Sequence, residues 1–419
     1  MVIGFDGSRV FAPDRTGTEN YSYQLLKALV EIDKKNKYIV YTRALTRRSK
    51  TITGYANFPK NFQFREITWS RFWTQGGLAK QTFKDNLDVL FVPAHTLPVI
   101  RRPGLKTVIT IHDLGSEYLP SMHQLKQRLY LSYMQKFQLR TATKIIAVSK
   151  ATKEDLVKKI GIDSKKIRVV YEGYDKKLFR PVKDNVLVNS LKQYDLQAGG
   201  YFLFVGTIQP RKNLERLIKA FAIFLEAARQ GTKNRSRLHS ARLRLVSRRT
   251  QPGNIDDSSV RSTAPHFLVT SGFAAFPYLV LVGSKGWLAD EIYRLPKKLG
   301  IEDRVKFSGY VPDEYLPALY SGAAALTFPS LFEGFGLPML EAQACGCPVL
   351  TSNTSSMPEV AGYGAIYVDP YSINDIVEGM VKVQSSKFKV QSVKAGFENI
   401  KRFSWERCAR ETLEVLEKL

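Results

Sequence analysis

Two glutamates separated by seven residues flank a glycine-bearing loop in the segment FPSLFEGFGLPMLEAQACGCPVLTSN, residues 328–353. A strand is predicted to end at Phe328, and a helix to begin at about Leu337-Pro338, where proline's missing N–H costs no hydrogen bond. Glycines let the backbone approach a ligand, and a helix N-terminus offers unpaired N–H groups and partial positive charge. Either glutamate alone is better explained as a solvated charge at the helix N-terminus. Together they predict a phosphate site, with Glu333 and Glu341 facing hydroxyl groups on either side.

A second cluster of polar residues lies in FVGTIQPRKNLERLIKAF, residues 204–221. Gly206-Thr207 follows a predicted strand directly, and Arg211-Lys212 stands at a helix start. Cations at the carboxyl end of a parallel strand lie where α/β sheets bind ligands, and arginine can pair with phosphate oxygens through two N–H groups. The alternative is a solvated basic turn capped by Asn213.

The 328–353 segment resembles the Glu-x7-Glu donor motif of family 4 glycosyltransferases, which are retaining enzymes of the GT-B fold. The resemblance implies that Glu333 contacts hydroxyls of the transferred sugar and that Glu341 contacts the nucleotide ribose. It also implies that three residues present their main chain to the donor phosphates and sugar: Phe335, Gly336 and Leu337.

Two further segments fit this donor site. The 204–221 segment resembles the family's diphosphate loop, in which Gly206 and Thr207 bind the donor while Arg211 and Lys212 share the charge. Some relatives carry an arginine where Thr207 stands here. SGYVPDEYLPALYS, residues 308–321, resembles the loop that receives the nucleobase, with Gly309 and Val311 as contacts. A plain strand–turn–helix explains that segment nearly as well.

The first half of the chain contributes weaker candidates. RTGTENYSYQLL, residues 15–26, resembles the family's glycine-bearing loop after the first strand, with Gly17 facing the cleft. His112 ends the strand in ITIHDL, and the matching histidine of relatives orients hydroxyls near the donor sugar and acceptor. A lone histidine is more often structural, but its place at a strand end favours function. His95 and Ser149 occupy similar positions and are weaker candidates.

Short apolar runs alternate with helical patterns along the chain, which predicts an α/β protein with parallel sheets. The predicted strands are 2–5, 38–41, 89–93, 107–111, 144–148, 167–171, 201–205, 278–282, 305–308, 323–328 and 348–351. The resemblance implies the GT-B arrangement, two Rossmann-like doubly wound domains facing a cleft, followed by a C-terminal helix.

The predicted domains are 1–185 for the acceptor and 186–402 for the nucleotide-sugar, with 403–419 as the C-terminal helix capped by Ser404. The polar stretch 189–200 is predicted to be a linker. The basic, aperiodic segment 229–277 is predicted to be a disordered insertion, because compact domains seldom contain structureless loops of this length.

Charge is distributed unevenly along the 419 residues. Residues 1–185 hold 34 Lys and Arg against 16 Asp and Glu, whereas the whole chain carries a formal charge of +25. This excess predicts an anionic partner for the first half, and an anionic membrane surface is our first hypothesis. Candidate contacts are Arg47, Arg48, Lys50 and the basic amphipathic stretch 124–140, although a solvated helix explains that stretch equally well.

No signal peptide or membrane span is expected, and the three cysteines, Cys345, Cys347 and Cys408, are predicted to be buried thiols of a cytoplasmic protein. No Asp-x-Asp motif is present, so we expect no metal and no cofactor beyond the nucleotide-sugar, for which GDP-mannose is the first candidate.

The predicted reaction is hexose transfer to a glycan or lipid-linked acceptor in cell-envelope polysaccharide or glycolipid synthesis. One alternative is another enzyme of the GT-B fold, either a phosphorylase or a sugar-nucleotide epimerase. The other is a basic nucleic-acid-binding protein, although the sequence contains no zinc-finger, RNP-type or basic-zipper pattern.

Overall fold

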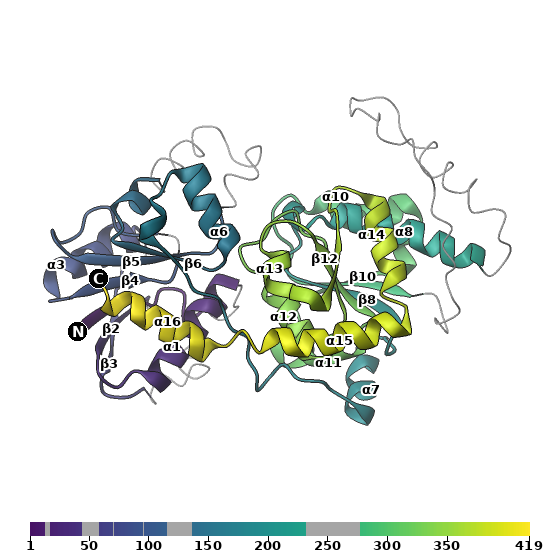
Figure 1. The fold of residues 1–419 in the computed structure, drawn as a ribbon, viewed down its shortest axis with the longest axis horizontal. Coiled ribbons are helices and arrows are strands. Elements are labelled where there is room, and N and C mark those ends of the chain that lie inside the picture. The colour runs from purple at the N-terminus through teal and green to yellow at the C-terminus, as the bar shows by residue number, and fades with distance from the viewer. Residues whose placement is uncertain (13–16, 44–57, 70, 95, 115–135, 232–276) are drawn as a thin grey trace. The chain divides into compact units, whose positions relative to one another are not determined.

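The computed structural model describes residues 1–12, 17–43, 58–69, 71–94, 96–114, 136–231 and 277–419. The chain forms two compact units (Figure 1). The first comprises Met1–Lys176, Phe332–Leu337 and Lys401–Leu419, and the second comprises Lys177–Leu331 and Pro338–Ile400. The predicted insertion 229–277 lies almost entirely outside the described residues, apart from the end of one helix.

The first unit is built on a seven-stranded parallel sheet of order β3-β2-β1-β4-β5-β6-β7. Its strands are β1 (Val2–Asp6), β2 (Lys37–Thr42), β3 (Phe62–Glu66), β4 (Val89–Val92), β5 (Lys106–Ile111), β6 (Lys144–Ala147) and β7 (Ile167–Val169). The central strands β4 and β5 are almost wholly buried, as expected for parallel strands covered on both faces.

The second unit contains a six-stranded parallel sheet of order β10-β9-β8-β11-β12-β13. Its strands are β8 (Tyr201–Val205), β9 (Tyr278–Val282), β10 (Val305–Gly309), β11 (Ala325–Phe328), β12 (Val349–Ser352) and β13 (Ala365–Val368). Eleven predicted strands are therefore confirmed, with ends shifted by at most two residues.

The sequence analysis missed β3 and β13, and both are edge strands. β3 carries Arg65 and Glu66, which are exposed, since an edge strand is solvated along one side. In β13 only Ile366 and Val368 are buried, so the apolar run is short.

Helices connect the strands. In the first unit they are α1 (Gly17–Ile32), η2 (Trp73–Leu78), α3 (Ala79–Lys84), α6 (Lys150–Asp155), η4 (Leu156–Ile160), η5 (Ser164–Lys166) and α16 (Trp405–Glu417). In the second unit they are α7 (Asp184–Lys192), η6 (Pro210–Lys212), α8 (Leu214–Gly231), α10 (Asp290–Leu299), η7 (Glu302–Arg304), η8 (Asp313–Tyr315), α11 (Leu316–Gly322), α13 (Met357–Ala361), η9 (Gly362–Gly364), α14 (Ile373–Lys382) and α15 (Ser386–Ile400). Helix α12 (Leu337–Ala344) begins where the chain passes from the first unit into the second. Within the described ranges, no helix combines the length and apolar character needed to cross a bilayer.

The seam between the units lies at Lys176, nine residues before the predicted limit at 185. The intervening residues pack on α11, because the backbone N–H of Val182 donates to Ser321 Oγ and Phe179 lies edge-on to Tyr320. The predicted linker is wrong for residues 189–192, which complete α7, and Leu191 there is buried.

The C-terminal helix α16 returns to the first unit and lies along α1 (Figure 1). Ser404 caps it by accepting a hydrogen bond from the backbone N–H of Arg407, as predicted. The Trp405 ring lies 5.8 Å from the Tyr21 ring of α1, between ring centroids. All three cysteines are free buried thiols.

Because Trp405 is 8% exposed and packs on Tyr21, Trp405→Ala should lower the free energy of unfolding by about 3–5 kcal/mol. Urea denaturation followed by circular dichroism measures the loss. Arg410→Ala is the control, since Arg410 is exposed on the same helix and should change the free energy by less than about 0.5 kcal/mol. Equal midpoints for both variants would show that α16 does not stabilise the first unit.

Candidate functional site

The loop between β11 and α12 has the conformation that the sequence predicts. Helix α12 begins at Leu337, with Pro338 in its first turn. Gly336 precedes it with φ of 99°, a conformation that side chains rarely allow. The first N–H groups of α12 therefore follow a residue with no side chain to block a ligand, which is the local geometry of a phosphate site.

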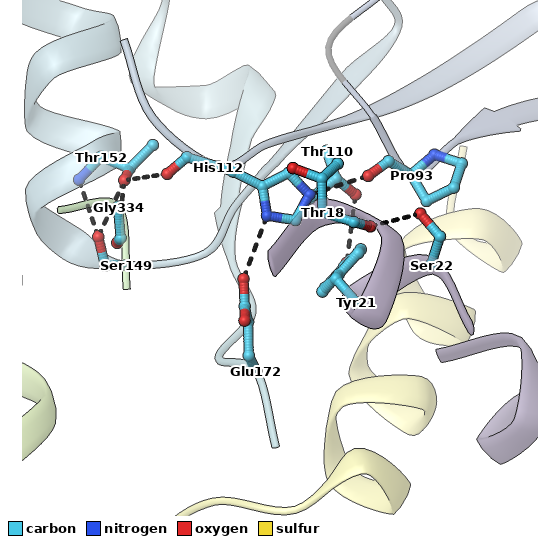
Figure 2. Close-up of polar contacts among 10 residues, drawn as sticks. All are labelled: Thr18, Tyr21, Ser22, Pro93, Thr110, His112, Ser149, Thr152, Glu172 and Gly334. Atoms are coloured by element: carbon cyan, nitrogen blue, oxygen red, sulfur yellow. Dashed lines mark hydrogen bonds and ion pairs between the residues drawn. The ribbon is translucent and has the colours of Figure 1, made fainter. Parts of the chain in front are cut away.

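Glu333 and its neighbours pack within the first unit. Glu333 is 7% exposed, and a side chain on Gly334 would overlap the carbonyl oxygen of His112. The Thr152 hydroxyl lies 3.2 Å from the His112 carbonyl oxygen and 3.4 Å from that of Gly334 (Figure 2). The Phe335 ring contacts those of Tyr171 and Phe403, with centroids 6.2 and 5.7 Å away. The backbone around Glu333 is thus fixed on both sides.

His112 follows β5 and is buried, with both ring nitrogens engaged (Figure 2). Nδ1 lies 3.1 Å from Glu172 Oε1, and Nε2 lies 3.0 Å from the Pro93 carbonyl oxygen. Burial opposes the charged ring, but the hydrogen bond and charge of Glu172, together with the Pro93 carbonyl and the Asp113 charge, outweigh it and raise the pKa of His112. A doubly protonated ring satisfies both acceptors.

This arrangement bears on the predicted role of His112. A ligand hydroxyl that hydrogen-bonds to the ring must replace Glu172 or Pro93. Glu172, which the sequence analysis did not select, is 4% exposed and follows the strand that ends near Val169. Its position directly after the predicted strand 167–171, in YEGYD, is the signal that could have identified it.

The weaker candidates have other surroundings. Ser149 caps α6 by accepting a hydrogen bond from the backbone N–H of Thr152, so its hydroxyl is explained locally. Gly17 is exposed at the first position of α1, and a side chain there would meet no atom within 4 Å. His95 lies outside the described residues, as do Arg47, Arg48, Lys50 and all of 124–140 except its last residues, 136–140, which are helical.

The basic turn after β8 lies against the segment that follows β11, the neighbouring strand. The Asn213 side-chain amide donates to the carbonyl oxygens of Pro329 and Pro370, at 3.0 and 2.6 Å. The backbone N–H of Leu331 donates to the Arg211 carbonyl oxygen at 2.9 Å. Lys212 is 7% exposed, with Nζ 5.1 Å from the centroid of the Phe328 ring. The structure thus brings Arg211 and Lys212 to the strand that leads into the Glu333 loop.

Three glycines stand side by side at the carboxyl ends of β8, β9 and β10. The backbone N–H of Gly206 donates to Val282, and that of Gly283 donates to Gly309, at 2.9 and 2.7 Å. All three have positive φ, and a side chain on Gly283 would overlap the Gly206 carbonyl. The sequence analysis selected Gly206 and Gly309 but missed Gly283, although it follows a predicted strand in the same way. Val311 is 4% exposed.

Glu341, in the second turn of α12, is tied to α11. The Tyr320 hydroxyl donates a hydrogen bond to Glu341 Oε2 at 2.8 Å. The pKa of Glu341 is raised to about 8, mainly because burial disfavours the charged carboxylate. The hydrogen bond from Tyr320 lowers the pKa in part, and the nearby charge of Asp313 adds to the increase. Part of the Glu341 surface stays accessible, which leaves room for a ligand hydroxyl.

The first unit holds a polar cavity of about 270 Å³ at the carboxyl ends of β1, β2 and β4. It is lined by Asp6, Ser8, Arg9, Ala12, Glu19, Arg43, Thr74, Ala94 and Thr96. Asp6 is buried, which raises the pKa of its carboxyl against the Ser8 hydrogen bonds and the charges of the two arginines. Among the described residues, no group of three or more His, Cys, Asp or Glu could hold a metal ion.

Comparison with known proteins agrees with this architecture. Residues 15–178 match the family described as Glycosyltransferase Family 4, and residues 277–396 match Glycosyl transferases group 1. The chain is 27% identical over 311 residues to O-antigen chain mannosyltransferase B of Escherichia coli, covering 74% of this chain and 70% of that one. It is 25% identical over 362 residues to O-antigen chain mannosyltransferase RfbU of Salmonella typhimurium, covering 85% and 83%.

Solved structures share the fold at low identity. The Anabaena protein HepE, crystallised with UDP and glucose, superposes with a TM-score of 0.69 at 18% identity, with both chains fully covered. WaaG, a glycosyltransferase involved in lipopolysaccharide biosynthesis, superposes with a TM-score of 0.68 at 16% identity, covering 99% of each chain. The two parallel sheets with their helices therefore define the GT-B fold, and the protein is a glycosyltransferase. It belongs to the family 4 group of these enzymes, whose two domain profiles together match more than half of the chain.

If Glu341 accepts hydrogen bonds from a nucleotide ribose, nucleoside diphosphate affinity should increase as the pH rises through about 8 and the carboxyl ionises. Tyr320→Phe removes the hydrogen bond that favours the carboxylate. It should therefore shift this pH profile upward and weaken binding roughly 10-fold at neutral pH. Titration calorimetry across the profile measures both effects.

Glu341→Gln should abolish the pH dependence between about pH 6 and 9, since Gln does not titrate. Tyr363→Phe is the control, because Tyr363 is fully exposed in the same unit and should leave the profile unchanged. An unshifted profile in Tyr320→Phe would contradict the role of Glu341.

Proposed function

We propose that this glycosyltransferase transfers a hexose, with mannose as the first candidate, from a nucleotide-sugar to a glycan or lipid-linked acceptor. The observation that carries the proposal is the start of α12 directly after Gly336, between Glu333 and Glu341. The names of the two relatives, O-antigen chain mannosyltransferases, support mannose as the sugar and a role in polysaccharide synthesis. GDP-mannose is the donor that we propose, for a glycan or glycolipid of the cell envelope.

The proposed chemistry is transfer with retention at the anomeric carbon. Breaking the glycosyl–phosphate bond places negative charge on the departing diphosphate and positive charge on the sugar ring. Arg211, Lys212 and the N-terminus of α12 would stabilise the diphosphate, while Glu333 orients sugar hydroxyls. The leaving phosphate would take the acceptor's proton during attack on the same face. Fixed cations would thus supply the charge that a divalent metal supplies elsewhere.

The acceptor is proposed to bind the first unit at the cavity around Asp6. The cavity holds two carboxylates and two arginines, whose charges cancel in sum, so it offers both hydrogen-bond acceptors and donors to hydroxyl groups. The buried Asp6 side chain would face the acceptor sugar. We place the protein on the cytoplasmic side of the envelope membrane, either in solution or at the membrane surface.

A thermal-shift panel of GDP-, UDP- and ADP-sugars, run with EDTA throughout, tests the donor. GDP-mannose at about a hundred times its dissociation constant should stabilise the protein by about 2.7 kcal/mol, whereas the others should stabilise it less. Mannose transfer should also survive chelation. Preference for a UDP-sugar would replace the proposed donor, and activity restored only by Mn²⁺ or Mg²⁺ would overturn the metal-free mechanism.

Lys212→Ala and Glu333→Ala should each lower the transfer rate by roughly 100-fold or more, since they remove charge stabilisation and sugar orientation. Steady-state kinetics on the purified variants measures the loss. Lys219→Ala, an exposed lysine on the following helix α8, is the matched control and should keep the wild-type rate. Near-wild-type turnover in Lys212→Ala would exclude it from the phosphate site.

A further inference from the structure

Large apolar side chains are exposed on one part of the first unit that the donor and acceptor sites do not use. Trp69, Phe72, Phe83 and Ile100 expose 47%, 77%, 53% and 70% of their surface. They lie in two segments, 69–84 and 97–102, and we call this surface the Trp69–Ile100 patch. Exposed apolar side chains that cluster in this way indicate an interaction surface.

Local backbone structure keeps these rings outward. Helices η2 and α3 run on as one helical stretch, Trp73 to Lys84. Gly76 and Gly77 lack side chains, and the Trp69 side chain lies against both positions. Phe72 precedes η2 with φ of 53°, an uncommon conformation for an aromatic residue. Lys80 and Phe83 are three residues apart within α3, which places these two side chains along the same side of that helix.

The second segment is tied to this helical stretch by hydrogen bonds. The Gln75 side chain donates to the Leu97 carbonyl oxygen at 3.0 Å and accepts from the backbone N–H of Val99 at 2.8 Å. The backbone N–H of Arg102 donates to the Thr82 hydroxyl at 3.1 Å. These bonds hold the segment that carries Ile100 beside the helical stretch that carries Phe83.

The charges within the patch all have one sign. Segments 69–84 and 97–102 contain five basic residues and no acidic residue; they are Arg71, Lys80, Lys84, Arg101 and Arg102. Arg71, Lys80 and Lys84 are exposed. Aromatic rings flanked only by cations match the interface of an anionic bilayer, where rings enter the headgroup layer and cations pair with lipid phosphates.

We propose that the Trp69–Ile100 patch docks the protein on an anionic lipid bilayer. Residues 1–185 contain 34 basic and 16 acidic residues, and this excess would attract the first unit to such a surface at distances beyond those of direct contact. Thr74, on the same helical stretch, lines the acceptor cavity, so docking brings that cavity close to the bilayer, where a lipid-linked acceptor would be held. The docking goes beyond the proposed function and stands without it.

Sedimentation with vesicles tests the docking. The full chain should sediment with vesicles of phosphatidylglycerol in phosphatidylcholine, less so as salt rises, and not with phosphatidylcholine alone. Phe72→Ser/Phe83→Ser should lose most of this binding. Lys80→Gln/Lys84→Gln should weaken it about 30-fold, because each basic residue near an anionic surface contributes about a factor of five.

Matched controls come from the second unit. Tyr363→Ser, at a fully exposed aromatic residue, and Lys297→Gln/Lys298→Gln, at two exposed lysines of α10, should sediment as the wild type does. Wild-type protein that stays in solution with anionic vesicles would overturn the proposal, as would patch variants that bind like the controls. A wild-type dimer that Phe72→Ser/Phe83→Ser dissociates, without vesicle binding, would instead assign the patch to contacts between copies.

Failure of the docking is distinguishable from failure of the proposed function. The patch variants should transfer sugar to a water-soluble acceptor at the wild-type rate, because neither the rings nor the lysines line the cavity or the donor loops. Circular dichroism melts that match the wild type would show that these variants fold. Transfer without vesicle binding in the wild type would reject the docking alone.

Discussion

Close approach of backbones at the carboxyl edge of the second sheet is the constraint on which the donor loops depend. Gly206, Gly283 and Gly309 stand there at the ends of neighbouring strands, where the Gly206 N–H donates to the Val282 carbonyl oxygen and the Gly283 N–H to that of Gly309. A side chain on Gly283 would occupy the position of the Gly206 carbonyl oxygen. The loops after β8, β9 and β10 therefore start from one compact edge, which is the edge at which α/β sheets bind ligands.

The polar groups of the site differ in how firmly they are fixed. Asn213 binds two carbonyl oxygens from distant segments and so fixes the turn that carries Arg211 and Lys212. Glu341 has one oxygen bound by Tyr320 and a raised pKa, so its protonation can respond to a ligand. The two ring nitrogens of His112 contact Glu172 and the Pro93 carbonyl oxygen, so the ring links the segments that follow three strands of the first sheet.

The two units differ in surface chemistry in a way that matches their proposed ligands. The first unit combines a polar cavity near β1 with the exposed rings and cations of the Trp69–Ile100 patch. The second unit carries Arg211 and Lys212 in the turn after β8, where a nucleotide phosphate is proposed to bind. Under these proposals, the net positive charge of the first unit and the two cations after β8 would serve separate partners.

The sequence by itself determined eleven of the thirteen described strands, the start of α12 and the residues around the Glu-x7-Glu motif. Apolar runs and a glycine–proline helix start are local signals, and they leave few alternative structures. The tertiary structure alone decided that Glu172 meets His112, that Tyr320 holds Glu341 and that α16 returns to α1. These partners lie 60 and 21 residues apart, or at opposite ends of the chain. Their contacts arise from packing between elements, to which no local pattern corresponds. The seam near Lys176 has the same origin, because residues 177–185 pack on α11 although nothing in their composition separates them from the first domain.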